Sequence, residues 1–331
     1  MRGKYYIREL EKRDYNKWDQ FVDESLEGTI FHKSFWLENA DLPSKIFGVF
    51  NDENLVAGFT SAIQKNKIGQ KILVNPYLTP YCGLLFRKEE ISYSRRISKN
   101  KEIAGLLINH ITHNYKNISL KMSPAVYDLQ PFIWNHFNIN LCYTYILDIS
   151  DLDGCWTKHF SSVIRRNIKK ARKDGLYVKA EEDFEKVVLL SAKTFERQNK
   201  ISKAKKMNIY GTQIFNELTN RGFCNNFICY DSDDKPIGCS FIVWDTKRCY
   251  YLIGGYDHEK SHSSASTLAM WEAIQFAAKD LGLKEFDFEG SMLEPIERFF
   301  RSFGGTLTPY YQVIKRSKLN ALYQKMAKVI K

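Results

Sequence analysis

Apolar and polar residues follow the same pattern in two segments of the chain, 47–63 and 227–243. Each segment has an apolar run, a turn rich in Asp and Asn, and a second apolar run that begins near Gly58 or Gly238. Asp and Asn tolerate left-handed backbone and bond to their own main chain, so such a turn between two apolar runs predicts a β-hairpin. The segments align without a gap, and we therefore predict equivalent hairpins in two halves of the chain.

The elements predicted after each hairpin also come in the same order. They are a strand, a helix, a second strand, a short helix introduced by a proline, and a closing strand. In the first half they lie at 72–74, 101–115, 118–122, after Pro131 and at 143–149; in the second, at 250–253, 264–281, 286–289, after Pro295 and at 310–314. This order predicts an α/β fold (mixed α+β) of two tandem domains, 1–150 and 151–331, each a mixed central sheet flanked by helices.

A basic helix is predicted at 155–174, where the domains join. Its apolar residues recur at helical spacing, and Gly175 ends it. Its other faces carry many cations, among them Arg165, Arg166 and Lys169. Like charges at this spacing repel, and a bound anion would relieve the repulsion; a solvated basic face is the alternative. The tail 318–331 is predicted as a second basic amphipathic helix.

The formal net charge of +11 indicates either a lysine-rich soluble surface or an anionic partner, such as nucleic acid, coenzyme A or lipid. The seven cysteines are scattered and form no Cys-x-x-Cys pair, so we expect neither disulfides nor zinc fingers. No apolar stretch has the form of a signal peptide or a membrane span. We therefore expect a cytoplasmic protein without stable membrane insertion. The oligomeric state is left open, and a monomer is favoured.

Three stretches together resemble one family: 29–36, 165–176, and 286–291 followed by 296–305. They are similar to the FemABX-like peptidyltransferases and FemAB-like acyltransferases of the GNAT superfamily. The resemblance implies tandem GNAT-like domains and amide-bond formation. Best-known members move an amino acid from aminoacyl-tRNA onto an amine of a peptidoglycan precursor, and relatives use other acyl donors. This chain departs from the pattern, with Glu38 near the place of an expected Lys and Phe300-Arg301 in place of Phe-Lys.

The resemblance implies a transferase that moves an acyl or aminoacyl group onto an amine acceptor, in cell-envelope or polysaccharide biosynthesis. The donor, an anionic aminoacyl-tRNA or acyl-coenzyme A, is left undecided, and no tightly bound cofactor is expected. The usual GNAT pyrophosphate loop is absent before helix 264–281. An acyl-coenzyme A-dependent N-acetyltransferase is one alternative. A nucleic-acid-binding protein and a catalytically inactive GNAT-like scaffold are alternatives of another class.

The candidate catalytic residues are Asp287, Glu289 and Arg301. Strand alternation predicts Asp287 and Glu289 on one face, where a carboxylate could accept the proton of the attacking amine. Arg301 could stabilise the negative charge that develops on the acyl oxygen. The alternative is a carboxylate that caps a helix or pairs with Arg298, and an arginine at the surface. The glycine at 290 permits close approach of a ligand.

Seven further residues are predicted to bind substrate: Trp36, Arg165, Arg166, Lys169, Gly290, Ser291 and Phe300. No metal is expected. The stretch from His258 to His262 has the form His-Glu-x-x-His, but it follows two glycines and precedes a run of serines. Zinc binding by this motif requires both His side chains on one helix face. We interpret the stretch as a loop beside the substrate site.

Overall fold

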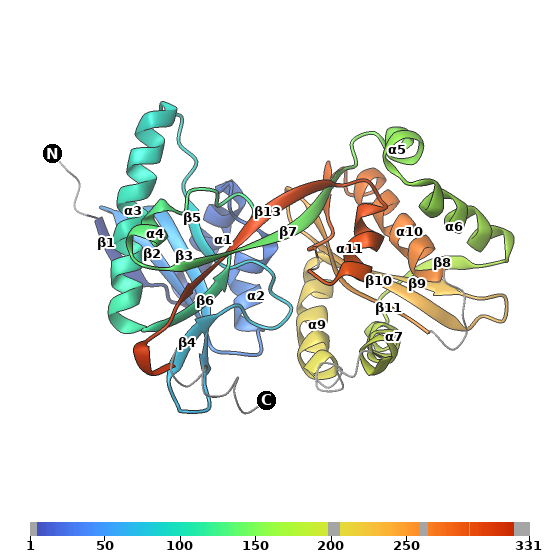
Figure 1. Ribbon diagram of the computed structural model, residues 1–331, viewed down its shortest axis with the longest axis horizontal. Coiled ribbons are helices and arrows are strands. Elements are labelled where there is room, and N and C mark those ends of the chain that lie inside the picture. Colours follow the sequence, from blue (N-terminus) through green and yellow to red (C-terminus); the bar gives the residue numbers. More distant parts are fainter. Residues whose placement is uncertain (1–4, 198–205, 258–263, 291, 321–331) are drawn as a thin grey trace. The chain divides into compact units, whose positions relative to one another are not determined.

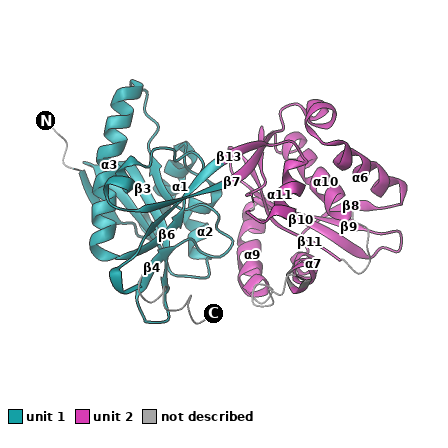
Figure 2. Ribbon diagram, in the orientation of Figure 1, with its two compact units in different colours: residues 1–142, 309–331 teal, residues 143–308 magenta. Residues whose placement is uncertain are grey.

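The structure, a computed structural model, describes residues 5–197, 206–257, 264–290 and 292–320. The chain divides into two compact units (Figures 1 and 2). Unit 1 comprises Met1–Cys142 and Pro309–Lys331, and unit 2 comprises Tyr143–Thr308. The tandem arrangement of α/β units is the one that the sequence predicts.

Unit 1 is built on a mixed sheet in the order β1-β2-β3-β4-β6-β13, in which β13 spans Thr306–Lys315 and β5 pairs with β3. Its own strands are β1 (Tyr5–Glu9), β2 (Ser44–Asn51), β3 (Asn54–Lys65), β4 (Lys71–Val74), β5 (Gly83–Phe86) and β6 (Asn117–Lys121). Its helices are η1 (Lys12–Asp14), α1 (Tyr15–Glu24), η2 (Ile30–His32), α2 (Ser34–Glu38), α3 (Tyr93–Asn114) and α4 (Gln130–Trp134). The apolar stripe of α3, from Ile103 to Ile111, packs on the sheet residues Phe47, Val49 and Phe59.

Unit 2 has a sheet in the order β7-β12-β11-β10-β9-β8, in which β7 spans Asn138–Asp148. Its own strands are β8 (Tyr177–Glu181), β9 (Cys224–Tyr230), β10 (Pro236–Trp244), β11 (Cys249–Tyr256) and β12 (Glu285–Asp287). Its helices are α5 (Leu152–Gly154), the π-helical turn η3 (Cys155–His159), α6 (Ser162–Lys173), α7 (Phe184–Arg197), the π-helical turn η4 (Met207–Gly211), α9 (Thr212–Arg221), α10 (Ala265–Lys279) and α11 (Glu294–Arg301).

Helices cover both faces of the unit 2 sheet (Figure 1). On one face, α6 and α10 form a core with Phe227 and Ile242. On the other face, Phe241 of β10 contacts Phe184 of α7 and Phe215 of α9. This alternation of Phe241 and Ile242 between two cores explains why β10 is a nearly continuous apolar strand.

Both predicted hairpins are confirmed. In unit 1, β2 and β3 pair antiparallel with Gly48 opposite Gly58. In unit 2, β9 and β10 pair antiparallel with Gly238 opposite Cys229. A side chain at position 58 would collide with Trp18, since a Cβ there would lie 2.2 Å from its ring. The glycine within each second strand, Gly58 or Gly238, thus allows other parts of the unit to approach the sheet closely.

The closing strands are exchanged between the halves, and here the sequence prediction was wrong. The strand predicted at 143–149 belongs to β7 (Asn138–Asp148), and its Ile146–Asp148 segment pairs with β12 of unit 2. The strand predicted at 310–314 belongs to β13 (Thr306–Lys315), which pairs with β6 of unit 1. A strand's apolar pattern identifies the strand but not its partner. The unit boundaries consequently differ from the predicted 1–150 and 151–331.

The helix predicted at 155–174 is interrupted. Phe160 has extended backbone, and the side chain of Ser161 accepts a hydrogen bond from the N–H of Ile164 to begin α6. Ser is a preferred N-terminal cap, and this signal outweighs the continuous apolar spacing across residue 160. Most of the predicted tail helix, residues 321–331, lies outside the described residues. Within the part of the chain that is described, no helix combines the length and apolar character that a membrane span requires.

Candidate active site

The end of strand β12 holds the two candidate carboxylates in different environments. Asp287, the last residue of the strand, is fully buried. The predicted strand continues to Glu289, but the observed one ends at Asp287, and Glu289 has a left-handed backbone with φ of 56°. Glu289 is half-buried. Strand alternation therefore does not hold at this point, and only Glu289 reaches partial exposure to solvent.

Asp287 is held by groups from three segments of unit 2. Its Oδ1 accepts hydrogen bonds from the Thr144 hydroxyl at 2.5 Å and from the backbone N–H of Glu289 at 2.8 Å. Its Oδ2 lies 3.5 Å from Nη1 of Arg248, whose other nitrogens bond to Glu285. A buried carboxylate requires such compensation. Asp287 thus fixes the backbone that carries Glu289.

Gly290 is required by the close approach of strand β7. Its φ is 63°, and a Cβ at this position would lie 2.0 Å from the carbonyl oxygen of Tyr143. Two consecutive left-handed residues, Glu289 and Gly290, therefore turn the chain sharply against β7. Strained non-glycine backbone of this kind is concentrated at functional sites, which makes Glu289 a candidate by geometry as well as by chemistry.

Aromatic side chains form the apolar core against which this turn packs. Phe300 is 6% exposed; its ring stacks on Phe288 at 5.4 Å between centroids and meets Tyr251 edge-on at 5.7 Å. Burial raises the pKa of Tyr251, and the thiol of Cys239 and the carboxylate of Glu289 add to the rise. Tyr251 is therefore a neutral phenol at physiological pH. The structure places Phe300, predicted to bind substrate, in the core that supports the site.

Arg301 bonds to its own helix rather than to the strand end. Its Nε lies 2.9 Å from Glu297 Oε1, and its side chain is 61% exposed. The same Glu297 oxygen accepts a hydrogen bond from the Tyr145 hydroxyl at 2.5 Å. Burial and this hydrogen bond raise the pKa of Tyr145 to about 12. Arg301 is thus available to a ligand from solvent. Arg298, which the sequence offered as an alternative partner for a strand carboxylate, instead pairs with Glu294.

The cations of α6 divide into two groups. Arg166, Lys169, Lys170, Arg172 and Lys173 are exposed along the helix, and of these Arg172 pairs with Glu272 at 2.8 Å. Arg165 instead folds back, and its Nη1 donates to the carbonyl oxygens of Trp156 at 3.1 Å, Thr157 at 3.3 Å and Phe160 at 2.7 Å. These carbonyls lie in or next to the turn η3, at the interruption before α6. Arg165 thus satisfies backbone acceptors, whereas Arg166 and Lys169 face solvent.

Replacing Arg165 with Ala should lower stability rather than anion affinity. Several carbonyls would lose a charged donor, which typically costs about 1.5–3 kcal/mol. Thermal unfolding of the variant should show a clear fall in Tm, and Lys169→Ala, on the same helix, should leave the Tm almost unchanged. An Arg165→Ala protein with unaltered Tm would contradict this role.

Trp36 lies within unit 1 and is 1% exposed. Its indole N–H donates to the Thr79 hydroxyl at 2.9 Å, and its ring meets Phe31 edge-on. The structure places this predicted substrate-binding residue in a core, with its polar atom already used.

Three residues at this site, Arg248, Tyr251 and Tyr145, were not predicted from the sequence. Arg248 follows a turn at Asp245 and lies next to β12 only because β11 and β12 pair in parallel. Side chains alternate between the two faces of a strand, and this rule applied to residues 249–256 could have indicated that Tyr251 faces the same core as Phe286 and Phe288. Nothing local to Tyr145 predicts its contact with Glu297, which is 152 residues away in the chain.

Two of the features predicted from the sequence lie in segments that the structure does not describe. Ser291 and the stretch 258–263, which contains His258 and His262, lie outside the described residues. Elsewhere, in the described ranges, no group of three or more His, Cys, Asp or Glu side chains is arranged to hold a metal. The absence of a metal remains a prediction.

Comparison with known proteins agrees with this architecture. Residues 158–301 match the family described as acetyltransferase (GNAT) domain, and the match lies within unit 2. FemX has a similar solved structure, with a TM-score of 0.67 at 14% identity, covering 92% of this chain and 96% of that one. A search of curated protein sequences finds no match.

Two further solved structures share the fold. A conserved protein of unknown function from Bacteroides thetaiotaomicron has a TM-score of 0.62 at 11% identity, covering 95% of this chain and all of that one. The C-terminal domain assigned to a lysylphosphatidylglycerol synthetase from Agrobacterium fabrum has a TM-score of 0.52 at 12% identity, covering 83% and 86%. Residues 158–301 of unit 2 thus match the GNAT domain family, and the predicted FemABX-like resemblance is confirmed at the level of the fold.

Proposed function

We propose that this protein is an N-acyltransferase that forms an amide bond at the end of β12 in unit 2, with Glu289 as the proton acceptor. The match of residues 158–301 to the GNAT acetyltransferase domain carries the proposal. Glu289, a half-buried residue whose Oε1 is buried, supplies a carboxylate that the reaction needs. Asp287, buried and held by Arg248 and Thr144, positions Glu289 and does not itself reach substrate.

The reaction is acyl transfer between a carbonyl donor and an amine. The nitrogen lone pair attacks the carbonyl carbon, and a C–N bond forms. The C–S bond of a thioester donor, or the C–O bond of an aminoacyl ester, then breaks. The nitrogen loses one proton to the Glu289 carboxylate, and the leaving thiol or hydroxyl takes up a proton. The proton that Glu289 has accepted can pass to the leaving group, which balances the step and restores the carboxylate.

Both candidate donors are polyanions, and the exposed cations of unit 2 suit either of them. Arg166, Lys169 and Lys173 have no acidic partner among the described residues, and Arg301 keeps most of its side chain in solvent. We propose that these groups attract the phosphates of an aminoacyl-tRNA or of acyl-coenzyme A. On the family resemblance, we also propose that the protein works in the cytoplasm in cell-envelope or polysaccharide biosynthesis.

Replacing Lys169 with Glu should raise the KM for the anionic donor severalfold at low salt and leave kcat nearly unchanged. Removing a surface charge from a steering surface changes association more than chemistry. The effect should shrink as the salt concentration rises. Glu217→Lys, in a distant exposed pair with Arg221 on α9, is a control for general charge effects. A fall in kcat alone for Lys169→Glu would contradict this role.

The proposal is tested with purified protein, a panel of amines, and two sets of donors, acyl-coenzyme A and aminoacyl-tRNA. The products are analysed by mass spectrometry for a new amide. We expect one donor class to give an amide at a rate above the uncatalysed reaction. If no combination of donor and amine gives an amide, while the folded protein transfers acyl groups to hydroxyls, the proposed reaction class is wrong.

A further inference from the structure

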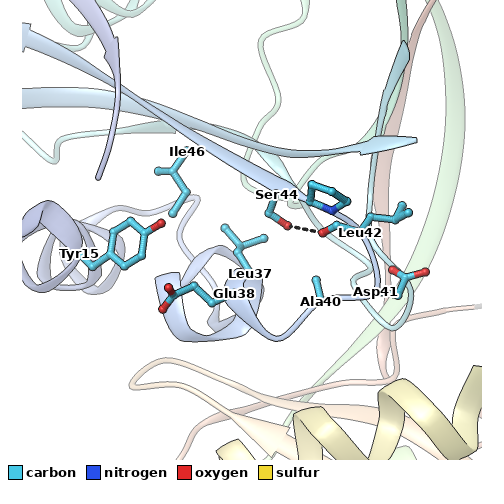
Figure 3. A pocket seen from close by; sticks show the side chains of 9 residues that line it. Tyr15, Leu37, Glu38, Ala40, Asp41, Leu42, Ser44 and Ile46 are labelled. Atoms are coloured by element: carbon cyan, nitrogen blue, oxygen red, sulfur yellow. Dashed lines mark hydrogen bonds between the residues drawn. The ribbon is translucent and has the colours of Figure 1, made fainter. Parts of the chain in front are cut away.

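A pocket lies in unit 1, and its lining includes Glu38, the residue near the place of the expected Lys. It has a volume of about 320 Å³ and opens between α1, α2 and the start of β2 (Figure 3). Its apolar wall includes Leu37, Ala40 and Ile46, while its charged groups are the carboxylates of Glu38 and Asp41. No Lys, Arg or His is among the described residues that line it.

The charge of this pocket is opposite to that of the protein. The chain has a net charge of +11, yet the charged side chains that line this cavity are acidic. In Figure 3 the two carboxylates lie at different ends of the pocket, with Leu37 and Ala40 between them. The phenol of Tyr15 lies on the same side as Glu38. Its pKa is raised by burial and by the Glu38 charge, so the hydroxyl remains neutral and can donate a hydrogen bond.

An ammonium group from the protein already contacts this pocket. Nζ of Lys12 lies 3.1 Å from Oε1 of Glu38, and the Lys12 side chain is 86% exposed. An exposed ion pair of this kind is weak, because water and salt screen it and the long side chain loses freedom. Lys12 therefore shows which chemical group the Glu38 carboxylate accepts, and it can be displaced by a ligand whose stem is held by the apolar wall.

We propose that this pocket binds an organic cation, an ammonium carried on an alkyl stem, in competition with Lys12. The stem packs on Leu37, Ala40 and Ile46, and the charge pairs with Glu38. A second cationic group at the other end of the stem would meet Asp41, whose Oδ1 is fixed by the backbone N–H of Tyr77 at 2.7 Å. An alkyl diamine thus suits the pocket better than an anion or a neutral alcohol. This proposal does not depend on the transferase reaction.

The test is a titration of the full chain with cadaverine at low salt, followed by calorimetry or by NMR. We expect saturable binding that is about fivefold weaker in Glu38→Gln and a fewfold tighter in Lys12→Ala, the range that an exposed charge pair supplies. Glu11→Gln is the matched control, since Glu11 is an exposed acid that pairs with Arg13 and does not line the pocket. The Glu11→Gln variant should bind cadaverine with the same affinity as the unchanged protein.

The same titration with 1-pentanol separates charge from apolar contact. Equal affinities for pentanol and cadaverine, or equal cadaverine affinities for Glu38→Gln and Glu11→Gln, would overturn the proposal. So would the absence of saturation at about 10 mM cadaverine, beyond the millimolar range of weak specific sites. Unchanged Tm values for both Gln variants establish that they are folded.

Discussion

Replacing Glu289 with Gln should lower the rate of amide formation about a hundredfold or more, the contribution usual for a general base. Gln has nearly the same shape as Glu but cannot accept the proton of the attacking amine. The left-handed backbone at position 289 is set by Asp287 and by the contact of Gly290 with Tyr143, so the variant should keep the turn. Single-turnover rates with saturating donor measure the chemical step directly.

Glu294→Gln is the control for this variant. Glu294 is an exposed carboxylate on the neighbouring helix α11, where it pairs with Arg298. Its replacement should change the rate less than about threefold, because exposed pairs contribute little. If Glu289→Gln and Glu294→Gln had the same chemical-step rate as the unchanged protein, Glu289 would not be the base.

Replacing Arg248 with Ala should destabilise unit 2 by about 3 kcal/mol or more, the cost typical of removing one partner of a buried ion pair. Asp287 would keep its bonds to Thr144 and to the Glu289 backbone but lose its cation. Glu285 would lose both bonds to the guanidinium. Thermal and urea unfolding measure the effect. Activity should fall as well, because Asp287 positions Glu289.

The control for Arg248 is Arg298→Ala, which removes an arginine from an exposed pair with Glu294. We expect a loss of less than about 1 kcal/mol there. Arg248→Lys keeps the positive charge but cannot make two parallel hydrogen bonds to Glu285. Its loss of stability should lie between those of Arg248→Ala and Arg298→Ala, and the protein should remain folded. Equal unfolding midpoints for Arg248→Ala and Arg298→Ala would show that Asp287 does not need this partner.

The sequence predicted the elements of the fold far better than their partners. Both hairpins, the helices α3 and α10 and the proline-initiated helices α4 and α11 were found, because apolar period and turn chemistry are local signals. The exchange of closing strands was not found. Pairing of β13 with β6 joins residues almost 200 positions apart, and the apolar pattern of a strand does not identify so distant a partner.

The candidate site was predicted in part for the same reason. The motif at 286–291 located the strand end, and Gly290 proved essential to its geometry. Alternation could not distinguish the buried Asp287 from the half-buried Glu289, since the strand ends between them. Arg165 and Arg166 are neighbours of the same type, but only Arg165 lies where it can bond the carbonyls near η3. Such differences depend on tertiary contacts.

The most direct test of the proposed function is one mass measurement on the acceptor amine after incubation with an isotopically labelled donor. Unchanged protein should add the labelled acyl group to the amine nitrogen, and Glu289→Gln, under the same conditions, should leave nearly all of the acceptor unmodified. An amide that forms at the same rate with Glu289→Gln, or a label found only on a hydroxyl of the acceptor, would contradict the account.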